Sequence, residues 1–450
     1  MITFKATNRN QLFLMPPSIQ EWLPQKHLAR FIVDVVEELD LNEIYKHYSG
    51  QGKDAYDPKA LLSLLFYGYS TGTFSSRKIE QATYDSIAFR YISANTHPDH
   101  DTIANFRKRF LPQISDLFIQ ILSIAQETGL LKVGKVSLDG TKVKANASKH
   151  KALSYGHIKK LETQLEKEVK ILMKKAKEAD NTKSDDGMNI PEEIARREDR
   201  LKAIKEAKEK IEARAAQRYE KECAEYKEKM DKRKAKEKLT GKKTSGKKPK
   251  EPVNEPKDKD QVNLTDEESR IMPTSGGGYE QCYNAQASAD HDSRLILHSH
   301  VTQNTNDKQE IIPTMKWYAT HPQLKSTTAF NADAGYFSED NIKACEQNSM
   351  TPYISFGKEQ HNQPLEERFK EADPLPDDPT DVERMKHRLQ TPEGKAIYAE
   401  RKSVIEPIFG IIKQVMGFRQ FMLRGFKKVQ DEWSLVCMAY NLKRLHMIMG

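Results

Sequence analysis

The chain has 450 residues, 37% hydrophobic and 31% charged, and its 73 Lys and Arg against 65 Asp and Glu leave a formal net charge of +8. A chain of this length predicts two or three folded units, one of them with a substantial core. It contains no apolar run near the roughly 18 to 20 residues of a membrane helix and no signal-peptide pattern at its start, so composition excludes a membrane-spanning protein and favours a soluble one.

The four cysteines are far apart in the chain and form no CxxC pair. A disulfide framework or a zinc site would need thiols in closer or more regular spacing. Isolated thiols are typical of a reducing compartment, so the sequence predicts a cytoplasmic protein with structural cysteines. The four are Cys223, Cys282, Cys345 and Cys437.

The first 130 residues have the pattern of helices. The segment DPKALLSLLFYGYSTG (57–72) begins with a capping Asp and a Pro at the first helical position, followed by a long apolar run. Residues 75–93 and 99–129 carry apolar residues near helical spacing, and we expect Asp101 and Thr102 to cap the second of these helices.

Basic residues lie beside the apolar stripe of the helix at 99–129, namely Arg107, Lys108 and Arg109. They could form an ordinary solvated helix face. They could instead contact phosphates from a helical DNA-binding domain, with Arg107 and Arg109 as the candidate contacts. The pattern leaves both interpretations open.

The segment KVGKVSLDGTKVKANAS (132–148) introduces strand-forming residues. Val136 and Leu138 precede an Asp-Gly dipeptide, and Val143 follows it. Because Asp-Gly between strand formers is a common hairpin signal, we expect a strand that ends near Asp139 and a hairpin-like turn after it.

Helical periodicity returns after this strand and continues to about residue 215. Two apolar stripes are separated by Gly187 and Pro191, which favours an antiparallel helical hairpin. One stripe contains Ile158, Leu161, Leu165, Leu172 and Ala176, and the other contains Ile194, Leu201, Ile204 and Ile211.

Most of the net charge lies in the basic segment, Lys232 to Asp260. It holds 12 Lys and Arg against 5 Asp and Glu, a net charge of +7 that leaves about +1 for the rest of the chain. Its charge, prolines and glycines predict a disordered linker. It could bind a polyanion such as DNA through Lys242, Lys243, Lys247 and Lys248, or serve only as a charged tether that keeps the hairpin soluble.

Beyond about residue 263 the pattern alternates between strands and helices, which predicts a mixed sheet flanked by helices. Pro407 is expected to interrupt one of these helices. The predicted strands are 283–289, 294–304, 326–334 and 351–356, and the predicted helices are 307–322, 338–348, 396–418 and 430–449.

Three carboxylates stand at positions where a site could form. Asp139 and Asp333 each end a predicted strand, and Glu406 lies on a long helix. A lone Asp in the stretch FNADAGYFSEDNI is usually a turn or helix-capping residue. Strand ends at one edge of a sheet are nevertheless where sites form, and three carboxylates suit hard Mg²⁺ or Mn²⁺. Asp290 is a competing acid, which we interpret as strand-end structure.

Further polar residues flank Glu406 in the pattern Y-x2-R-x4-E-x6-K, formed by Tyr398, Arg401, Glu406 and Lys413. In a straight helix Arg401 and Glu406 would not share a face, whereas Glu406 and Lys413 would. A cation beyond a metal-binding Glu can hold phosphate. The other interpretation is a surface ion pair, which is common.

These motifs together resemble a DDE transposase of a bacterial insertion sequence, in particular the 1182 family with its InsH-like N-terminal domain. The resemblance covers nearly the whole chain. It departs from the broader group in one respect, since four residues instead of three separate Arg401 from Glu406. The motifs that carry it are YSTGTFSSRKIE, HPDHDTIANFRKRF, SLDGTKVKANASK, TDEESRIM, YNAQASAD, NADAGYFS, YAERKSVIEPIFGIIKQVMGF and FMLRGFKKVQDEWSLVCMAYNLKRL.

The resemblance implies an α+β or α/β protein with an RNase H-like catalytic domain. Asp139, Asp333 and Glu406 would be its catalytic and metal-binding acids, and Tyr398, Arg401 and Lys413 its Y-R-E-K residues, with two Mg²⁺ or Mn²⁺ ions as cofactors. The implied domains are a helical InsH-like DNA-binding domain at 1–130, the first catalytic strands at 131–150, the helical hairpin and linker at 151–262, and the remaining catalytic domain at 263–450.

The implied activity is binding of the terminal inverted repeats, metal-dependent strand cleavage and strand transfer into target DNA. The resemblance further implies a homodimer on paired ends, with no membrane partner, in the nucleoid-associated part of a bacterial cytoplasm. An alternative is a catalytically silent DNA-binding relic. A helical scaffold built on residues 150–215 would leave the acid-bearing second half unexplained.

Overall fold

A mixed sheet forms the centre of the fold in this computed structural model. β1 (Lys135–Lys144) pairs in parallel with β7 (Ala329–Ala332), and β7 pairs in parallel with β8 (Thr351–Ile354). On the other side of β1 lies β5 (Tyr279–Asp290), which pairs antiparallel with β6 (Ile296–Thr302). All four residues of β7 are buried, as expected for a strand covered on both faces. The predicted mixed sheet is confirmed.

The structure describes residues 18–48, 55–179, 190–240, 247–274, 276–321, 324, 327–357 and 374–449. The chain divides into two compact units, of which Met1–Val143 and Asn284–Gly450 together form one and Lys144–Tyr283 forms the other. The predicted helical N-terminal region and RNase H-like mixed sheet both lie in the first unit, the predicted helical insertion lies in the second, and the predicted domain bounds stay predictions.

β1 runs without a turn through Asp139 and Gly140, so the predicted hairpin-like turn at the Asp-Gly dipeptide is wrong. A tight Asp-Gly hairpin turn needs positive φ, and Gly140 is not among the glycines that adopt it. The glycine serves a close approach instead. A Cβ atom here would meet Gln286 Nε2 and would lie 2.7 Å from Asp307 Oδ1.

The N-terminal region is helical, as predicted. Its elements are η1 (Ile19–Glu21), α1 (Leu28–Glu38), α2 (Asn42–Tyr45), α3 (Pro58–Thr71), α4 (Ser76–Asp85), α5 (Ile87–Ile92) and α6 (His100–Glu127). The predicted cap of α3 is confirmed, because the Asp57 side chain accepts a hydrogen bond from the Lys59 N–H.

Two details of these helices differ from prediction. The helix expected at 75–93 is divided into α4 and α5 at Ser86, whose backbone is extended. α6 is capped by Asp99, whose side chain accepts from the Thr102 N–H at 2.6 Å, and Asp101 lies in the first turn. An acid in the first turn still stabilises the helix through its dipole.

The remaining elements of this unit flank the sheet, and all but α12 and the short η4, which were not predicted, lie close to the predicted positions. They are α9 (Ile311–Ala319), η4 (Ala334–Tyr336), α10 (Glu339–Gln347), α12 (Asp381–Gln390), α13 (Pro392–Gly410), the π-helix η5 (Ile411–Val415) and α14 (Phe426–Met449). Pro407 does not interrupt α13, which continues to Gly410. The proline is exposed, so the carbonyl that loses its helical partner can be solvated.

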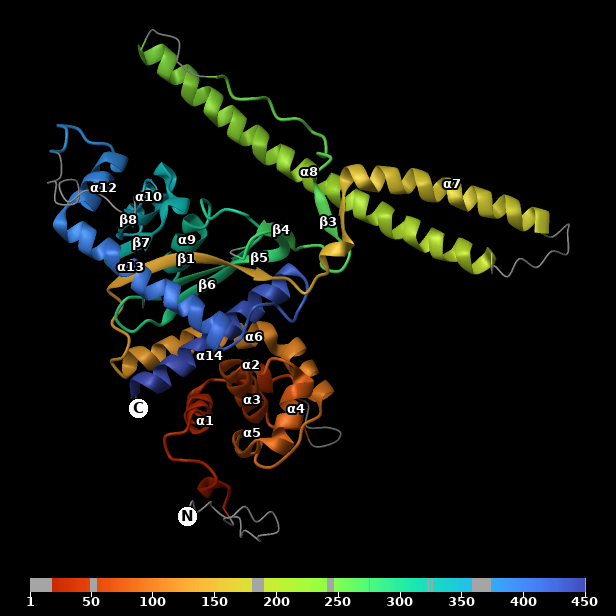
Figure 1. The fold of residues 1–450 in the computed structure, drawn as a ribbon. Helices are drawn as coiled ribbons and strands as arrows, with labels where there is room; N and C mark the ends of the chain where they lie inside the picture. The colour runs from red at the N-terminus through yellow and green to blue at the C-terminus, as the bar shows by residue number, and fades with distance from the viewer. Residues whose placement is uncertain are drawn as a thin grey trace, which may run out of the picture. The chain divides into compact units, whose positions relative to one another are not determined.

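α14 is buried along most of its length because the sheet and the N-terminal helices both pack on it (Figure 1). The Asn441 side chain accepts from the Ile296 N–H and donates to the Ile296 carbonyl, both at 2.8 Å, and so satisfies the backbone of β6. On the side of α3, the Ser70 hydroxyl donates to the Ala439 carbonyl at 2.9 Å. One helix therefore joins the N-terminal helices to the sheet.

A buried polar network strengthens this junction. The Glu432 carboxylate on α14 accepts from the Tyr69 hydroxyl at 2.9 Å and from the backbone N–H groups of Met422 and Leu423 at 3.0 Å. Arg107 donates to the Tyr69 hydroxyl and to the Phe74 carbonyl, both at 3.0 Å. A buried charge is tolerated only when its hydrogen-bonding capacity is satisfied, so the three side chains depend on one another.

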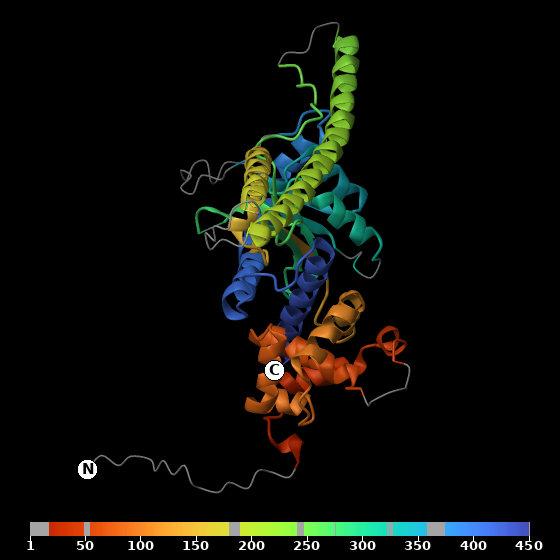
Figure 2. The same cartoon turned by 90° about the vertical axis from the view of Figure 1, so that its right-hand side faces the viewer.

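The second unit contains the predicted helical hairpin. α7 (Tyr155–Ala179) and the first part of α8 (Ile190–Thr240) lie side by side in both views (Figure 1, Figure 2). Lys208 pairs with Glu162 and Arg197 with Glu168, both at 2.8 Å, so the helices are antiparallel. Their shared core contains Tyr155, Ile158, Leu165, Ile204, Ala207, Ile211 and Val262.

Short strands close the base of this unit. β2 (Ala152–Ser154) pairs antiparallel with β3 (Gln261–Asn263), and β4 (Arg270–Pro273) pairs with the first residues of β5. The 3₁₀-helix η2 (Lys149–Lys151) precedes β2. These elements were not predicted, because three or four residues are too few to show a periodic pattern.

The structure corrects the prediction of disorder for part of the basic segment. α8 continues through Lys232 to Thr240, where Lys, Glu, Ala and Leu are good helix formers and the first glycine comes only at Gly241. Further along, the Lys247 carbonyl accepts from Arg233, and Asp260 pairs with Arg218 at 3.0 Å. Lys242 and Lys243 lie outside the described residues.

Within the described part of the chain, no helix has both the length and the apolar character that a membrane crossing requires.

We expect Glu432→Ala to lower the free energy of unfolding of the first unit by about 3–5 kcal/mol, because it leaves the Tyr69 hydroxyl and two backbone N–H groups without an acceptor and removes the negative charge that acts on Arg107. Urea titration followed by circular dichroism measures the change. Glu432→Gln keeps an acceptor oxygen and should lose less. The control is Glu127→Ala at an exposed position on α6, and equal losses in Glu432→Ala and the control would contradict the prediction.

Candidate active site

Two acids lie side by side at one edge of the sheet. β1 and β7 are parallel, and Ser137 on β1 is opposite Asn331 on β7. Asp139 and Asp333 each follow two residues later, so the same register carries both to neighbouring positions. Adjacent strands lie only about 4.8 Å apart. The register therefore brings together carboxylates that are 194 positions apart in the chain.

Asp333 also has the local role expected of a lone Asp after a strand. It caps η4, and its side chain accepts from the Gly335 N–H at 2.8 Å. This hydrogen bond fixes the direction of the carboxylate just beyond β7. The capping interpretation and the site interpretation are thus compatible in one residue.

Asp139 is in an environment that disfavours its charged form. Burial, followed by the negative charge of Asp333, raises the pKa of the Asp139 carboxyl from 3.8 to about 7. The Arg401 guanidinium and a hydrogen bond of 2.7 Å from the Gly140 N–H oppose this rise. The pKa remains raised because one guanidinium does not offset burial together with neighbouring carboxylates.

Arg401 links the strand acids to the helix acid. Its buried guanidinium lies with Nη1 3.4 Å from Asp139 Oδ2 and Nη2 3.9 Å from Glu406 Oε1. The helical spacing of Arg401 and Glu406 predicted different faces, and the long arginine side chain spans that difference. The guanidinium carbon also lies 5.8 Å from the ring centre of Tyr398. Arg401 Nε is buried without a hydrogen-bond partner among the described residues.

Lys413 comes from the π-helix η5 and reaches the strand of Asp139. Its ammonium donates to Thr141 Oγ1 at 2.5 Å and to the Lys142 carbonyl at 3.0 Å. The wider turn of a π-helix alters which residues share a face, so the seven-residue spacing from Glu406 does not alone determine where Lys413 points.

Glu406 is the most exposed of the three acids, with 57% of its side chain accessible. The structure thus assembles Asp139, Asp333, Arg401 and Lys413 at one place, and Glu406 joins them through Arg401. Among the described residues, no three His, Cys, Asp or Glu side chains converge closely enough to hold a metal ion as they stand.

Two family models match the chain. One, described as a transposase domain (DUF772), matches residues 17–109, and the other, described as a transposase DDE domain, matches residues 244–442. The chain belongs to the DDE transposases. No curated relative and no solved structure matches it.

The two matched ranges contain most, but not all, of the residues predicted for the site of this transposase. The DDE match contains Asp333, Arg401, Glu406 and Lys413, whereas Asp139 lies before its first residue. The DUF772 match covers α1 to α5 and the first turns of α6. The predicted resemblance to transposases of insertion sequences is confirmed, and the assignment to the 1182 family stays a prediction.

The DDE class implies the use of a divalent metal ion, and the residues at the sheet edge fit such an ion. Asp139 and Asp333 offer carboxylate oxygens, which hard divalent cations prefer. Besides burial, the charges of Asp333 and Asp307 both raise the pKa of Asp139, so both disfavour its charged form. A bound cation would relieve that repulsion.

Several polar residues beside the acids were not predicted. Asn284 and Gln286 are two positions apart on β5, so their side chains lie on the same face of the strand. Asp307 lies between β6 and α9. Gln286 accepts from the buried Tyr336 hydroxyl at 2.5 Å. The sequence did contain a signal for Asp307, because it is an acid between a strand and a helix in the same way as Asp333.

Two of the other predicted residues have structural roles. Arg107 is buried in the network with Tyr69 and Glu432, so it is not available as a surface contact to DNA, and that interpretation is corrected. Its position beside the apolar stripe placed it within reach of the core. Asp290 accepts from the Ser293 N–H at 2.8 Å and forms a turn after β5, as expected for a strand-end residue.

Arg109 remains exposed on α6, where it donates to the His47 carbonyl at 3.2 Å. Lys247 and Lys248 are exposed in the second unit. These three are available to a polyanion, while Lys242 and Lys243 lie outside the described residues.

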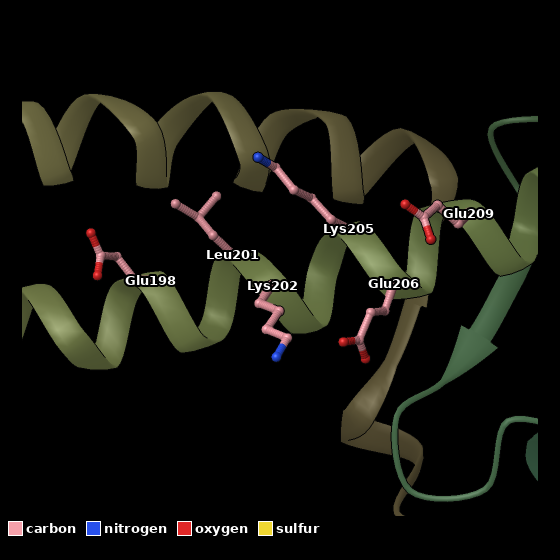
Figure 3. Close-up of a pocket in the computed structure, with 6 residues that line it drawn as sticks. All are labelled: Glu198, Leu201, Lys202, Lys205, Glu206 and Glu209. Atoms are coloured by element: carbon pink, nitrogen blue, oxygen red, sulfur yellow. The ribbon is translucent and has the colours of Figure 1, made fainter.

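A hollow of about 380 Å³ lies along α8 in the second unit (Figure 3). It is lined by one apolar residue and by acids and bases of both signs, which gives it no preference for a ligand of either charge. The lining residues are Glu198, Leu201, Lys202, Lys205, Glu206 and Glu209.

We expect Asp139→Asn to gain stability relative to the unmodified transposase as pH rises. Because the folded state binds the Asp139 proton more tightly than the unfolded state, the unmodified chain loses stability between its ordinary pKa of 3.8 and about 7. The variant lacks this loss. Urea midpoints in EDTA at about pH 5 and about pH 8 measure the difference. An exposed control, Asp292→Asn, should show none, and a constant gap between Asp139→Asn and the unmodified chain at both pH values would contradict the prediction.

Proposed function

We propose that this transposase cleaves DNA at the ends of its insertion sequence and joins the exposed 3′-hydroxyls to target DNA, with Asp139, Asp333 and Glu406 as its catalytic acids. The observation that carries the proposal is the parallel register of β1 and β7. It supports two carboxylates acting at one point, with the cations of Arg401 and Lys413 beside them.

Asp139 and Asp333 would hold divalent metal from the sheet, and Glu406 would join them from α13. We propose Mg²⁺ or Mn²⁺, and two ions. When bound, such ions activate the attacking oxygen and stabilise the leaving oxygen of a phosphodiester. The raised pKa of Asp139 favours this assignment, because an acid that resists ionisation alone becomes an anion readily beside a cation.

The cations of the motif would then act on the DNA. Arg401 now lies between Asp139 and Glu406, and a metal ion there would compete with it for both carboxylates. Its guanidinium would turn to a phosphate, for which the unpaired Nε is an available donor. Lys413 would hold a second phosphate beside β1, and Tyr398 would support the Arg401 side chain.

Recognition of the terminal inverted repeats would lie with the N-terminal helices, on which Arg109 is the exposed candidate contact. The basic segment would add affinity that is independent of sequence, through Lys247 and Lys248 and through Lys242 and Lys243. From the resemblance to transposases we also propose a homodimer on paired ends, acting at the nucleoid of a bacterial cytoplasm.

The second candidate is a catalytically silent DNA-binding relic. The absence of a preformed three-ligand group among the described side chains favours it, whereas the retained acids and cations at the sheet edge favour activity. Cleavage of DNA that carries the element's own ends, with and without divalent metal, separates the two.

We expect Asp139→Ala, Asp333→Ala and Glu406→Ala each to abolish strand cleavage while leaving binding to the element's ends largely intact. A metal ligand acts mainly on the transition state, so its loss lowers the rate of the chemical step and spares ground-state binding. Cleavage on sequencing gels and mobility shifts on the same labelled DNA measure the two properties.

Addition of EDTA should reproduce the loss of cleavage in the unmodified chain. The matched control is Asp292→Ala, an exposed acid in the turn between β5 and β6. Full cleavage by any of the three variants would remove that residue from the proposed site.

We expect replacement of Lys242, Lys243, Lys247 and Lys248 with Gln to weaken binding to all duplexes about equally. Fewer counterions are then released on binding, so the slope of log affinity against log salt should become shallower. Titrations at several salt concentrations on the element's ends and on unrelated duplexes measure both. An unchanged slope would favour the tether interpretation, and a loss confined to the element's ends would contradict the proposed division of labour.

A further inference from the structure

Asp307 lies among polar side chains close to Asp139 in the candidate site. It follows β6, and its Oδ1 atom accepts from Asn284 Nδ2 at 2.6 Å and from Gln286 Nε2 at 2.7 Å. Lys142 Nζ lies 3.5 Å from the same oxygen. Three donors on one oxygen fix the carboxylate in place, and two of them are amides two positions apart on β5.

The same carboxylate lies against the chain next to both strand acids. Gly140 directly follows Asp139, and a Cβ atom there would be 2.7 Å from Asp307 Oδ1. Gly335 donates its N–H to Asp333, and a Cβ atom there would be 4.0 Å from Asp307 Oδ2. A side chain at Gly140 would displace Asp307, so this glycine permits the close approach, whereas a Cβ atom at Gly335 would only be in ordinary contact with it.

Among the described residues, the second carboxylate oxygen of Asp307, Oδ2, accepts no hydrogen bond. All the hydrogen bonds that the structure describes for this carboxylate end on Oδ1, while Oδ2 lies on the side of Gly335. The side chain is 25% exposed, so water or an ion can reach it. The two amides and the ion pair with Lys142 all use Oδ1, so these contacts leave Oδ2 for a further partner.

We propose that Asp307 is a fourth carboxylate of the divalent-metal site, held by Asn284, Gln286 and Lys142 so that its free Oδ2 serves the ion at Asp139 and Asp333. This inference rests on the proposed function, since it assumes that those two acids bind metal. On this basis the sheet side of the site contributes Asp139, Asp333 and Asp307, and Glu406 approaches from the helix. Because no three of the described acids converge closely enough to hold an ion as they stand, Asp307 would be a positioning residue that reaches the ion through a water molecule.

The test is binding of Mn²⁺ to the full chain without DNA, measured by electron paramagnetic resonance of the free ion. Asp307→Asn retains the shape and one acceptor oxygen and should weaken Mn²⁺ binding about 10-fold or more, as losses of supporting residues at metal sites do. Asp340→Asn, an exposed acid in the first turn of α10, should bind as the unmodified chain does. Asp139→Asn should lose the same binding event.

The outcomes separate the inference from the proposed function. Loss in Asp139→Asn with unchanged affinity in Asp307→Asn would overturn the role of Asp307 and leave the metal site intact. Unchanged binding in Asp139→Asn would overturn the proposed metal site, and the inference with it. Affinity is counted per folded molecule from the circular dichroism signal, so a lower urea midpoint with unchanged affinity assigns Asp307 a structural role only. Should Asp307→Asn not fold, Asp307→Ser, which keeps one acceptor oxygen for the amides, replaces it under the same criteria.

Discussion

The parallel pairing of β1 with β7 is the constraint on which the candidate site depends. A shift of one residue in this register would turn one of the two acids to the opposite face of the sheet. The pairing is also non-local, because the strands are separated by the whole second unit and by β5, β6 and α9. Burial of both faces of β7 holds the register, so the core of the first unit and the geometry of the site have one cause.

Because that pairing brings carboxylates together, the fold also places cations around them. Burial, followed by the charges of the neighbouring carboxylates at this sheet edge, raises the pKa of Asp139. The fold places Arg401, Lys413 and Lys142 around them, and each cation reaches its position from a different element or strand position. Such an arrangement keeps the acids together in the absence of metal, at the cost of a guanidinium where an ion would lie.

The long elements of this fold could be predicted because their patterns repeat over several turns. α3, α6, α7, the first part of α8 and most of the strands and helices after residue 279 lie close to the predicted positions, whereas α8 continues well past the predicted end of the hairpin. Features set by tertiary contact could not be predicted in this way. The hairpin-like turn at Asp139 and Gly140 failed because Gly140 makes room for Gln286 and Asp307, which are distant in the chain.

The candidate site shows the same division. Asp139, Asp333 and the Y-R-E-K residues could be named from motifs, whereas the link from Arg401 to both Asp139 and Glu406 depends on a side-chain path that helical spacing does not describe. Arg107 was interpreted from its neighbours as a surface cation. Its partners Tyr69 and Glu432 lie on other helices, and no local pattern indicates a buried acid so far along the chain.

The buried network at Glu432 has a consequence for synthesis of the chain. Tyr69 and Glu432 are 363 positions apart, which at bacterial and eukaryotic elongation rates corresponds to a delay of roughly 20 to 70 s. During this interval the N-terminal helices have been made, but α14, which covers them, has not. The nascent N-terminal region therefore exposes an apolar face, and its Arg107 and Tyr69 lack the carboxylate of Glu432, until the final helix is translated. The N-terminal region can complete its packing only after the whole chain has been made. A chain truncated before α14 therefore lacks the last helix and also the contacts that bury the N-terminal helices.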